Sequence, residues 1–486
     1  MYRKLKITLF FLIPMFASSC EEWLNLIPPD GLVRDEYWQS KEDIQTSLMG
    51  AYSAFAQMDG TLFILGELRG DLVTYDANLS SDYRDIMNGN IYPDNVLSDW
   101  SKFYTIINFC NSILKYAPLV QQIDPTYTDY QRKGFEAEAI FLRSLAYFYL
   151  VRTFRDVPLV LEASESDNAK FFLPVSPASK VLAQIKADLI VARQGVTEDY
   201  GSLQKNKGRA SKAAINALLA DICLWNFEYE DCISFAEAVE SENLFILPSS
   251  HWFENFYPGN SLESIFEFQF DASLGQSNHT YTMTYVQRNY LASKTALEFL
   301  DPAISKEIIR GDGSIRMTDS KIWKYAGAAG DGRTLRTGTA STSGNFIIYR
   351  MSDVLLMKAE ALSQIERYDE ALTIVNDIRN NRLMLPVQPA YSPETFEDII
   401  LEERAHELAF EGKRWFDLLR MGRRNNFQRK GKLIEYIIQN VPSTQRLLLS
   451  IKLTNPGGWY LPIQADELNR NYNLVQNPYY AGYDTD

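Results

Sequence analysis

Histidine and cysteine, which supply many catalytic and metal-binding groups, are scarce in this chain of 486 residues. The three histidines, His251, His279 and His406, form no H-E-x-x-H pair of the kind that binds zinc in hydrolases. The chain also lacks a C-x-x-C pair, a G-x-S-x-G elbow and an EF-hand loop. We therefore expect no metal site, no cofactor and no enzymatic activity.

Apolar runs long enough to cross a membrane are also absent, and the one pronounced apolar stretch lies at the N-terminus. Residues 1–19 contain three cations, then an apolar run at 7–16, then small residues directly before Cys20. This is the anatomy of a bacterial export signal. A cysteine at this point is where lipoprotein signals are cleaved and lipidated, although Ala17 stands where leucine is usual. We predict a lipoprotein signal peptide over 1–19 and lipidation of Cys20, the alternative being an ordinary signal peptide with a cysteine nearby.

The balance of charge excludes some partners. Loss of the three cations of the signal would take the net charge from −14 to −17. So negative a protein should repel nucleic acid and anionic lipid surfaces, and we predict neither as a partner. The remaining cysteines, Cys110, Cys223 and Cys232, are odd in number and lie in helix-like apolar stretches, so we expect buried thiols.

Most of the sequence has the apolar spacing of α-helices. Three long segments show this spacing, at 41–58, 100–115 and 135–152. Segments 211–239 and 352–379 share a plan of helix, charged turn and helix, which is the unit of tetratricopeptide repeats. Residues 264–270 alternate like a strand. We predict a mainly α fold in which tetratricopeptide-like helix pairs form a scaffold, with long irregular loops and a few short strands.

The best enzymatic candidate is a cluster of carboxylates near residue 405. Glycoside hydrolysis requires a pair of carboxylates, and Glu402, Glu403, Glu407 and Glu411 supply four. However, three of them are spaced by four residues on one predicted helix, among arginines and a lysine, which favours a solvated or salt-bridged face. A surface glycoside hydrolase that uses Glu403 and Glu407 is the less favoured alternative.

The loops of the predicted fold are rich in aromatic residues. Residues 252–290 contain ten aromatics in 39 positions, about twice the 13% average of the chain. A flat ring can stack on the C–H face of a sugar while polar side chains bind its hydroxyls. The alternative for each ring singly is a place in the core, most of all for Trp100, which heads a helix, and for Trp323, which lies beside a possible strand. We predict that ligand-binding loops at roughly 60–100 and 250–345 contribute the contacts Asp76, Asn78, Tyr83, Arg84, Trp100, Asn278, Tyr281, Tyr285, Tyr290 and Trp323.

Residues 404–420, with the sequence RAHELAFEGKRWFDLLR, resemble the signature of the SusD/RagB family of outer-membrane nutrient-binding lipoproteins. Other segments agree with this family in order along the chain: CEEWL at 20–24, FLRSLAYFY at 141–149, YRMSDVLL at 349–356, YLPI at 460–463 and QNP at 476–478. The resemblance extends over essentially the whole mature chain. It implies a single SusD-like domain over residues 20–486.

The resemblance also implies a function and a place in the cell. It implies a lipid-anchored protein on the exterior of the outer membrane that passes captured nutrient to a SusC-like TonB-dependent β-barrel transporter. The helix pairs would face the barrel, and the protein would act as a hinged lid. Within the signature, Trp415 and Phe416 would pack inward while Arg404, Glu407 and Glu411 form buried or half-buried pairs. We expect a glycan ligand, with peptide capture of the RagB-like kind as the alternative.

Overall fold

The computed structural model describes residues 37–76, 79–164, 172–242, 246–325, 342–389 and 391–482. The predicted signal peptide, Cys20 and Asn78 lie outside these described residues. Within them the fold is mainly helical with six short strands, as the sequence predicts. Among the described residues, no helix combines the length and apolarity needed to cross a bilayer.

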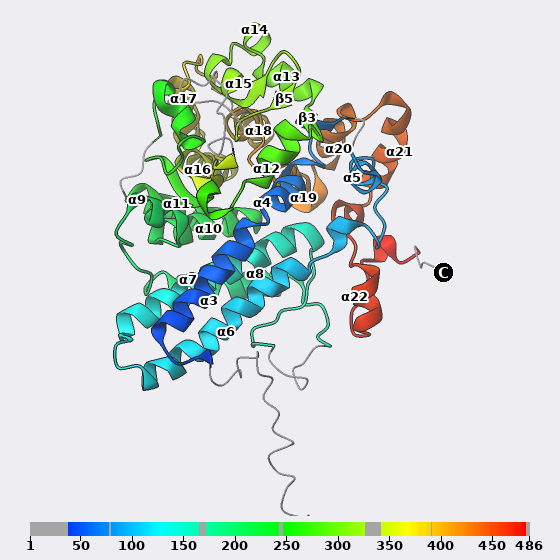
Figure 1. The fold of residues 1–486 in the computed structure, drawn as a ribbon. Coiled ribbons are helices and arrows are strands. Elements are labelled where there is room, and N and C mark those ends of the chain that lie inside the picture. The colour runs from blue at the N-terminus through cyan, green and yellow to red at the C-terminus, as the bar shows by residue number, and fades with distance from the viewer. Residues whose placement is uncertain are drawn as a thin grey trace, which may run out of the picture.

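Four long helices form one end of the molecule. They are α3 (Lys41–Ala56), α6 (Ser101–Ile123), α7 (Asp129–Phe154) and α8 (Ala178–Ala192), and they pack side by side in the lower half of Figure 1. The first three confirm the predicted helices, although α6 and α7 are longer than their apolar patterns. Ser40 and Asp43 form the capping box that starts α3. Helix α7 is buried on nearly all faces, and Pro158 follows its end.

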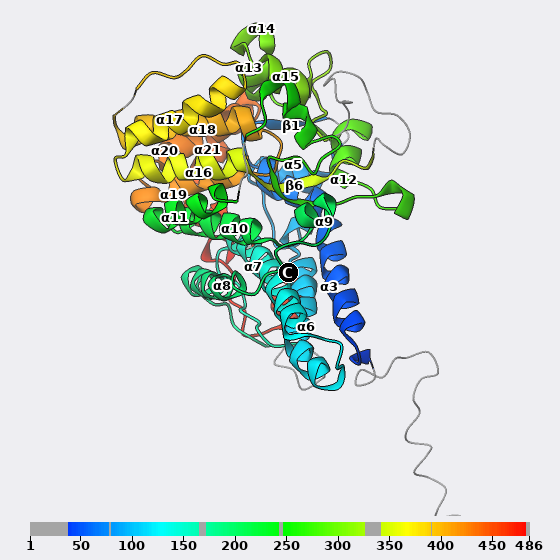
Figure 2. The same cartoon turned by 90° about the vertical axis from the view of Figure 1, so that its left-hand side faces the viewer.

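The two predicted helix pairs are both present and pack together. One pair is α10 (Lys212–Trp225) and α11 (Tyr229–Glu240), and the other is α16 (Met351–Gln364) and α17 (Tyr368–Asn381). Helix α11 packs on α16, so pairs far apart in sequence become neighbours in one stack (Figure 2). The stack continues through α18 (Pro393–Leu408), α19 (Arg414–Phe427), α20 (Lys430–Gln439) and α21 (Ser443–Leu453). Cys110, Cys223 and Cys232 are buried, as predicted.

Short strands bring the two predicted loop regions together. Strands β1 (Val73–Tyr75), β3 (Tyr290–Ala292), β5 (Lys321–Ile322) and β4 (Ile315–Arg316) form an antiparallel sheet in that order. Its register pairs Tyr75 with Tyr290 and Leu291 with Lys321. A second sheet pairs β2 (Ser264–Phe268), which confirms the predicted strand, with β6 (Phe346–Arg350).

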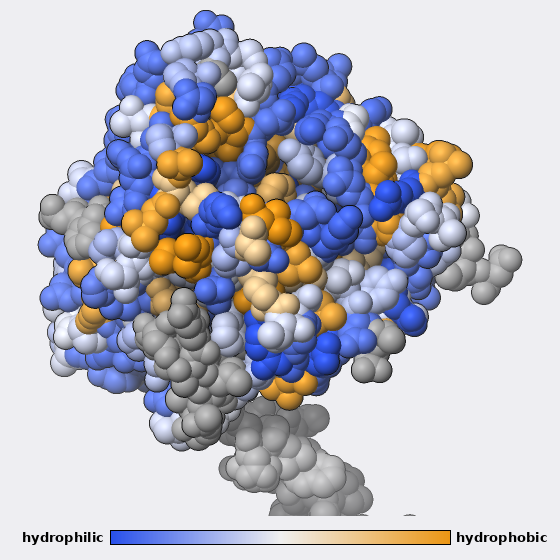
Figure 3. All heavy atoms as spheres, turned by 90° about the horizontal axis from the view of Figure 1, so that it is seen from above, coloured by the Kyte–Doolittle hydropathy of each residue, from blue (hydrophilic) through white to orange (hydrophobic). Residues whose placement is uncertain are grey.

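Shorter helices complete the described part of the fold. They are α4 (Asp59–Glu67), α5 (Ser81–Met87), α9 (Leu203–Gly208), α12 (His279–Tyr281), the π-helical turn η5 (Thr282–Val286), α13 (Lys294–Leu300), α14 (Pro302–Ser305), α15 (Ile308–Ser314) and α22 (Ala465–Arg470). The face in Figure 3 is largely hydrophilic, and its apolar residues gather in separate patches.

Beneath the sheets, ion pairs replace part of the apolar core. Glu407 accepts hydrogen bonds from Arg310 (3.1 Å), Arg350 (2.7 Å) and Arg382 (2.8 Å), and all four side chains are 0% exposed. Glu407 and the three arginines also pair with, or lie beside, further buried glutamates. We use the term buried network for these four residues together with Glu263, Glu403 and Glu411.

A second set of buried pairs joins Arg404 to Asp353 (2.9 Å) and to Asp417 (2.8 Å). Trp415 and Phe416 are each only 2% exposed. The signature at 404–420 is therefore structural, and its predicted pairs and inward-packing rings are confirmed.

Candidate functional site

Four of the ten predicted ligand contacts are interior residues. The exposed fraction is 3% for Trp100, 0% for Asn278, 1% for Tyr290 and 8% for Trp323. Tyr290 packs against Phe63 and Tyr83 because the β1–β3 pairing turns its ring inward. The indole N–H of Trp323 donates to the carbonyl of Asp312 (2.8 Å). These four side chains therefore lie in the interior and do not form an exposed row. Composition alone does not show which way a side chain faces.

Tyr281 and Tyr285 are the predicted rings that reach the surface together. Both are half-buried, and their rings stack with centroids 5.7 Å apart and planes 11° from parallel. They lie four residues apart on α12 and η5, which places them on one face. Asn278 has a positioning role here, because its side-chain oxygen accepts the N–H of Tyr281 (3.0 Å) and its amide donates to Gly344 (2.7 Å).

Asp59 fixes the start of this segment from beneath. This buried carboxylate at the first turn of α4 accepts the backbone N–H of Thr280 (2.9 Å) and its hydroxyl (3.1 Å), and it lies 2.8 Å from Nδ1 of His279. The hydrogen bond to Asp59 raises the pKa of His279. Asp59 is not among the residues predicted from the sequence, because its contact with Thr280 spans about 220 residues of chain and leaves no local pattern.

Cationic side chains flank the tyrosine pair. Arg316 donates to the hydroxyl of Tyr285 (2.8 Å), and Nζ of Lys321 lies 4.5 Å from the centroid of the Tyr285 ring. Arg316 is also held by both oxygens of Asp319, at 2.9 and 2.5 Å. Arg288 lies three residues beyond Tyr285. We term Tyr281, Tyr285, Arg288, Arg316 and Lys321 the tyrosine shelf.

The remaining predicted contacts in the described residues directly follow β1 or lie on α5. Asp76 is a neighbour of the shelf, with a carboxylate oxygen 3.9 Å from Nε of Arg288. Tyr83 lies on α5 and packs edge-on against the buried Tyr290. Arg84 is half-buried on the same helix. The sites predicted from the sequence do not include Arg288, Arg316 or Lys321, because only the pairing of β3, β5 and β4 brings the last two to the tyrosines.

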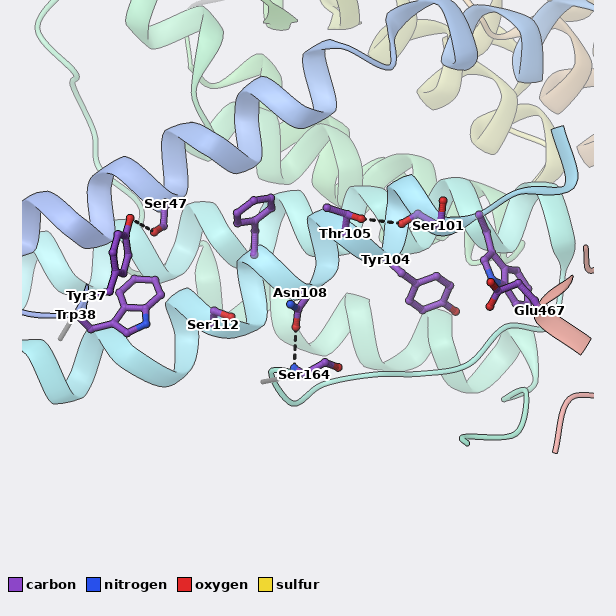
Figure 4. A pocket seen from close by; sticks show the side chains of 12 residues that line it. Tyr37, Trp38, Ser47, Ser101, Tyr104, Thr105, Asn108, Ser112, Ser164 and Glu467 are labelled. Carbon is purple, nitrogen blue, oxygen red and sulfur yellow. Dashed lines mark hydrogen bonds between the residues drawn. The ribbon is translucent and has the colours of Figure 1, made fainter. Parts of the chain in front are cut away.

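A separate groove of about 590 Å³ runs along α6 (Figure 4). Trp38 stands at one end, backed by Tyr116 at a centroid distance of 4.8 Å, and Glu467 stands at the other. Ser101, Thr105, Asn108 and Ser112 follow one face of α6 between them. Trp100 belongs to the wall of this groove and not to the shelf. The full lining is Tyr37, Trp38, Ser47, Trp100, Ser101, Tyr104, Thr105, Asn108, Phe109, Ser112, Ser164 and Glu467.

Two models of known protein families match this chain, one over its N-terminal half and one over the part that contains the signature. A model of the SusD family matches residues 317–480, and a model described as starch-binding and associating with the outer membrane matches residues 22–224. The chain belongs to the SusD-like family. Proteins of this family are non-catalytic binding proteins. The carboxylates of the hydrolase alternative agree with that, because one nitrogen of Arg310 binds both Glu403 and Glu407 inside the buried network.

Individual SusD-like relatives match most of the chain. A SusD-like protein of Formosa agariphila is 26% identical over 476 residues, which is 86% of this chain and 92% of the relative. A crystal structure of a SusD superfamily protein from Bacteroides thetaiotaomicron has a TM-score of 0.72 and 24% identity, covering 91% of this chain and 99% of the other. A laminarin-binding SusD-like protein has a TM-score of 0.71 and 21% identity, covering 91% and 100%.

Proposed function

We propose that this SusD-like protein is a cell-surface lipoprotein that captures oligosaccharide or polysaccharide on the tyrosine shelf and delivers it to a SusC-like TonB-dependent transporter. The observation that carries the proposal is the stacked pair Tyr281 and Tyr285, held at the surface by buried Asp59. Rigid aromatic rings bind sugar faces at low entropy cost, and the neighbouring polar groups can bind hydroxyls.

The lipid anchor and the partner are part of the same proposal. Cys20 follows a signal of lipoprotein type, and two or more acyl chains give a durable anchor. The description of one matching family model associates that family with the outer membrane. A protein tethered there could pass ligand directly to a transporter in the same membrane, and helix pairs of the scaffold offer a broad surface for docking on it.

Isothermal titration of the lipid-free chain from residue 21 tests glycan binding. The panel contains laminarihexaose, maltohexaose, a trigalacturonate, a sulfated carrageenan hexasaccharide and a mixture of casein peptides. We expect at least one glycan to bind, and Tyr281→Ala to weaken it about tenfold, which corresponds to about 1.4 kcal/mol of stacking and desolvation. Tyr130→Ala is the matched control, because Tyr130 is 59% exposed on α7, away from the shelf.

Clear binding of peptides without any glycan would replace this ligand class by the peptide alternative. Equal loss of affinity in the Tyr281 and Tyr130 variants would show that the shelf is not the binding surface. For the anchor, Cys20→Ala should release the protein from the membrane fraction, and its persistence there would contradict lipidation of Cys20.

A further inference from the structure

Two cations lie against the ring of Tyr285, and a third lies near them, in a protein whose net charge is −14. The guanidinium carbon of Arg316 and Nζ of Lys321 lie 5.2 and 4.5 Å from the centroid of the Tyr285 ring. Arg288 is close enough that its charge, like that of Arg316, acts on Lys321. Like charges repel, so such a cluster is costly unless something compensates it.

The carboxylates nearby compensate this cluster only in part. Asp319 holds Arg316 through two short hydrogen bonds, and therefore matches one of the three charges. Asp76 reaches Arg288 only at 3.9 Å, and the Arg288 side chain stays 43% exposed. Within the part of the chain that the structure describes, no carboxylate lies within 4 Å of Lys321.

The electrostatics of Lys321 agree with this geometry. Desolvation, followed by the charges of Arg316 and Arg288, lowers the pKa of Lys321, and Asp319 offsets this only partly. A bound anion would relieve the repulsion, because it would add the negative charge that the neighbouring carboxylates do not supply. The stacked tyrosines lie directly beside this position, so a sugar ring and an acidic group could bind together.

We propose that the glycan bound by the tyrosine shelf is acidic, with a carboxylate or sulfate group seated at Lys321 and Arg288 while a sugar ring packs on the tyrosine pair. This inference rests on the proposed glycan-binding function and adds the class of ligand. A neutral glucan would stack on the same rings, but it would leave the cations uncompensated.

The test compares acidic and neutral glycans on the lipid-free chain by isothermal titration at 50 and 300 mM NaCl. The probes are trigalacturonate for a carboxylate, the carrageenan hexasaccharide for a sulfate, and laminarihexaose as the neutral sugar. We expect one acidic probe to bind at least tenfold more tightly than laminarihexaose at 50 mM NaCl. We expect its affinity to fall several-fold at 300 mM, because salt screens exposed charges.

Variants of Lys321 provide the second arm. Lys321→Gln should reduce the affinity for the acidic probe at least fivefold and leave that for laminarihexaose within twofold, whereas Lys321→Arg should retain acidic binding. Lys294→Gln is the matched control, because Lys294 is 90% exposed on α13 and pairs only with Glu298, at 3.6 Å, among the described residues. Thermal unfolding of each variant establishes that the fold is intact.

The outcomes separate this inference from the proposed function. If laminarihexaose binds as tightly as the acidic probes, depends on Tyr281 and is indifferent to Lys321→Gln, the acidic class is wrong and glycan capture on the shelf stands. If no glycan binds, both fail. A preference for trigalacturonate over the sulfated probe, or the reverse, decides which acidic group is recognised.

Discussion

The buried network around Glu407 and the tyrosine shelf around Tyr285 both bring arginines and acidic groups together, but they differ in burial and in the balance of charge. In the network three arginines surround one carboxylate, and none of the four side chains is exposed. On the shelf, Arg316 and Arg288 remain 30% and 43% exposed, and Lys321 has no close carboxylate among the described residues. Charges that are sealed and matched hold the fold, whereas charges that are open and unmatched are available to a ligand.

The pKa of Glu407 shows how closely the network is matched. Burial alone would raise this pKa, but Arg382, Arg350 and Arg310 outweigh burial and hold it well below the usual value. A carboxyl whose pKa is lower in the folded state contributes stability above its unfolded pKa. That contribution is lost only as the pH falls below about 4.5 and through the folded value. Glu407 should therefore stay charged at neutral pH.

The largest effect should come from opening the network. Glu407→Ala leaves Arg310, Arg350 and Arg382 buried without their shared partner, which should cost about 3–5 kcal/mol of unfolding free energy. Urea denaturation measures this loss. Glu402→Ala is the control, since Glu402 is exposed on the same helix and its loss should change stability by less than about 0.5 kcal/mol. Similar losses of unfolding free energy in both variants would mean that the buried network contributes no more to stability than an exposed carboxylate does.

A smaller effect on stability, with a clear effect on binding, should follow from Asp59→Ala. The change removes the acceptor of the Thr280 N–H and of its hydroxyl, and it should cost about 2 kcal/mol. Because Tyr281 follows directly, we expect glycan affinity to fall about tenfold even below the unfolding temperature. Titration together with thermal unfolding measures both. Full affinity in a folded Asp59→Ala variant would show that the shelf needs no support from α4.

Glu67 is a buried carboxylate that, among the described residues, forms no ion pair within 4 Å. Burial raises its pKa to about 8, although one oxygen accepts the N–H groups of Gly412 (2.8 Å) and Lys413 (3.2 Å). Because the folded pKa lies above the unfolded value, the folded state binds an extra proton, and stability falls as the pH rises from about 4.5 to 8.

Glu67→Gln should remove this dependence on pH. Between pH 6 and 8.5 the wild type should lose about 2.5 kcal/mol more unfolding free energy than the variant, since each unit of pH below the folded pKa is worth about 1.4 kcal/mol for one proton. Urea denaturation at the two pH values measures the difference. Parallel pH profiles would show that Glu67 is already ionised in the folded protein at pH 6.

A region of this molecule can be predicted from the sequence when the residues that form it lie close together along the chain. The helix pairs follow from local spacing, which the sequence records directly. The buried pairs of residues 404–420 are implied by the family resemblance, because partners such as Arg350 lie far away along the chain. The shelf depends on the contact of Asp59 with Thr280 and on the strand pairing that places Arg316 and Lys321. No local pattern in the sequence encodes these long-range contacts. The sequence predicts Tyr290 as a ligand contact, but its ring is buried, because its register with Tyr75 sets the direction of the side chain and no local pattern encodes that register.

The smallest effect is expected in the groove along α6, which resembles the shelf in its rings but differs in charge. Glu467 is the one charged side chain in the lining described above, and the other polar groups are neutral hydroxyls and an amide. Phe109 is 38% exposed in its wall, so Phe109→Ala should change the affinity of the shelf for an acidic glycan less than twofold. Titration of this variant beside Tyr281→Ala gives the direct comparison. A tenfold loss in Phe109→Ala with full binding in Tyr281→Ala would move the ligand from the shelf to the groove. It would also mean that a neutral aromatic wall, and not the cations around Tyr285, selects what this protein captures.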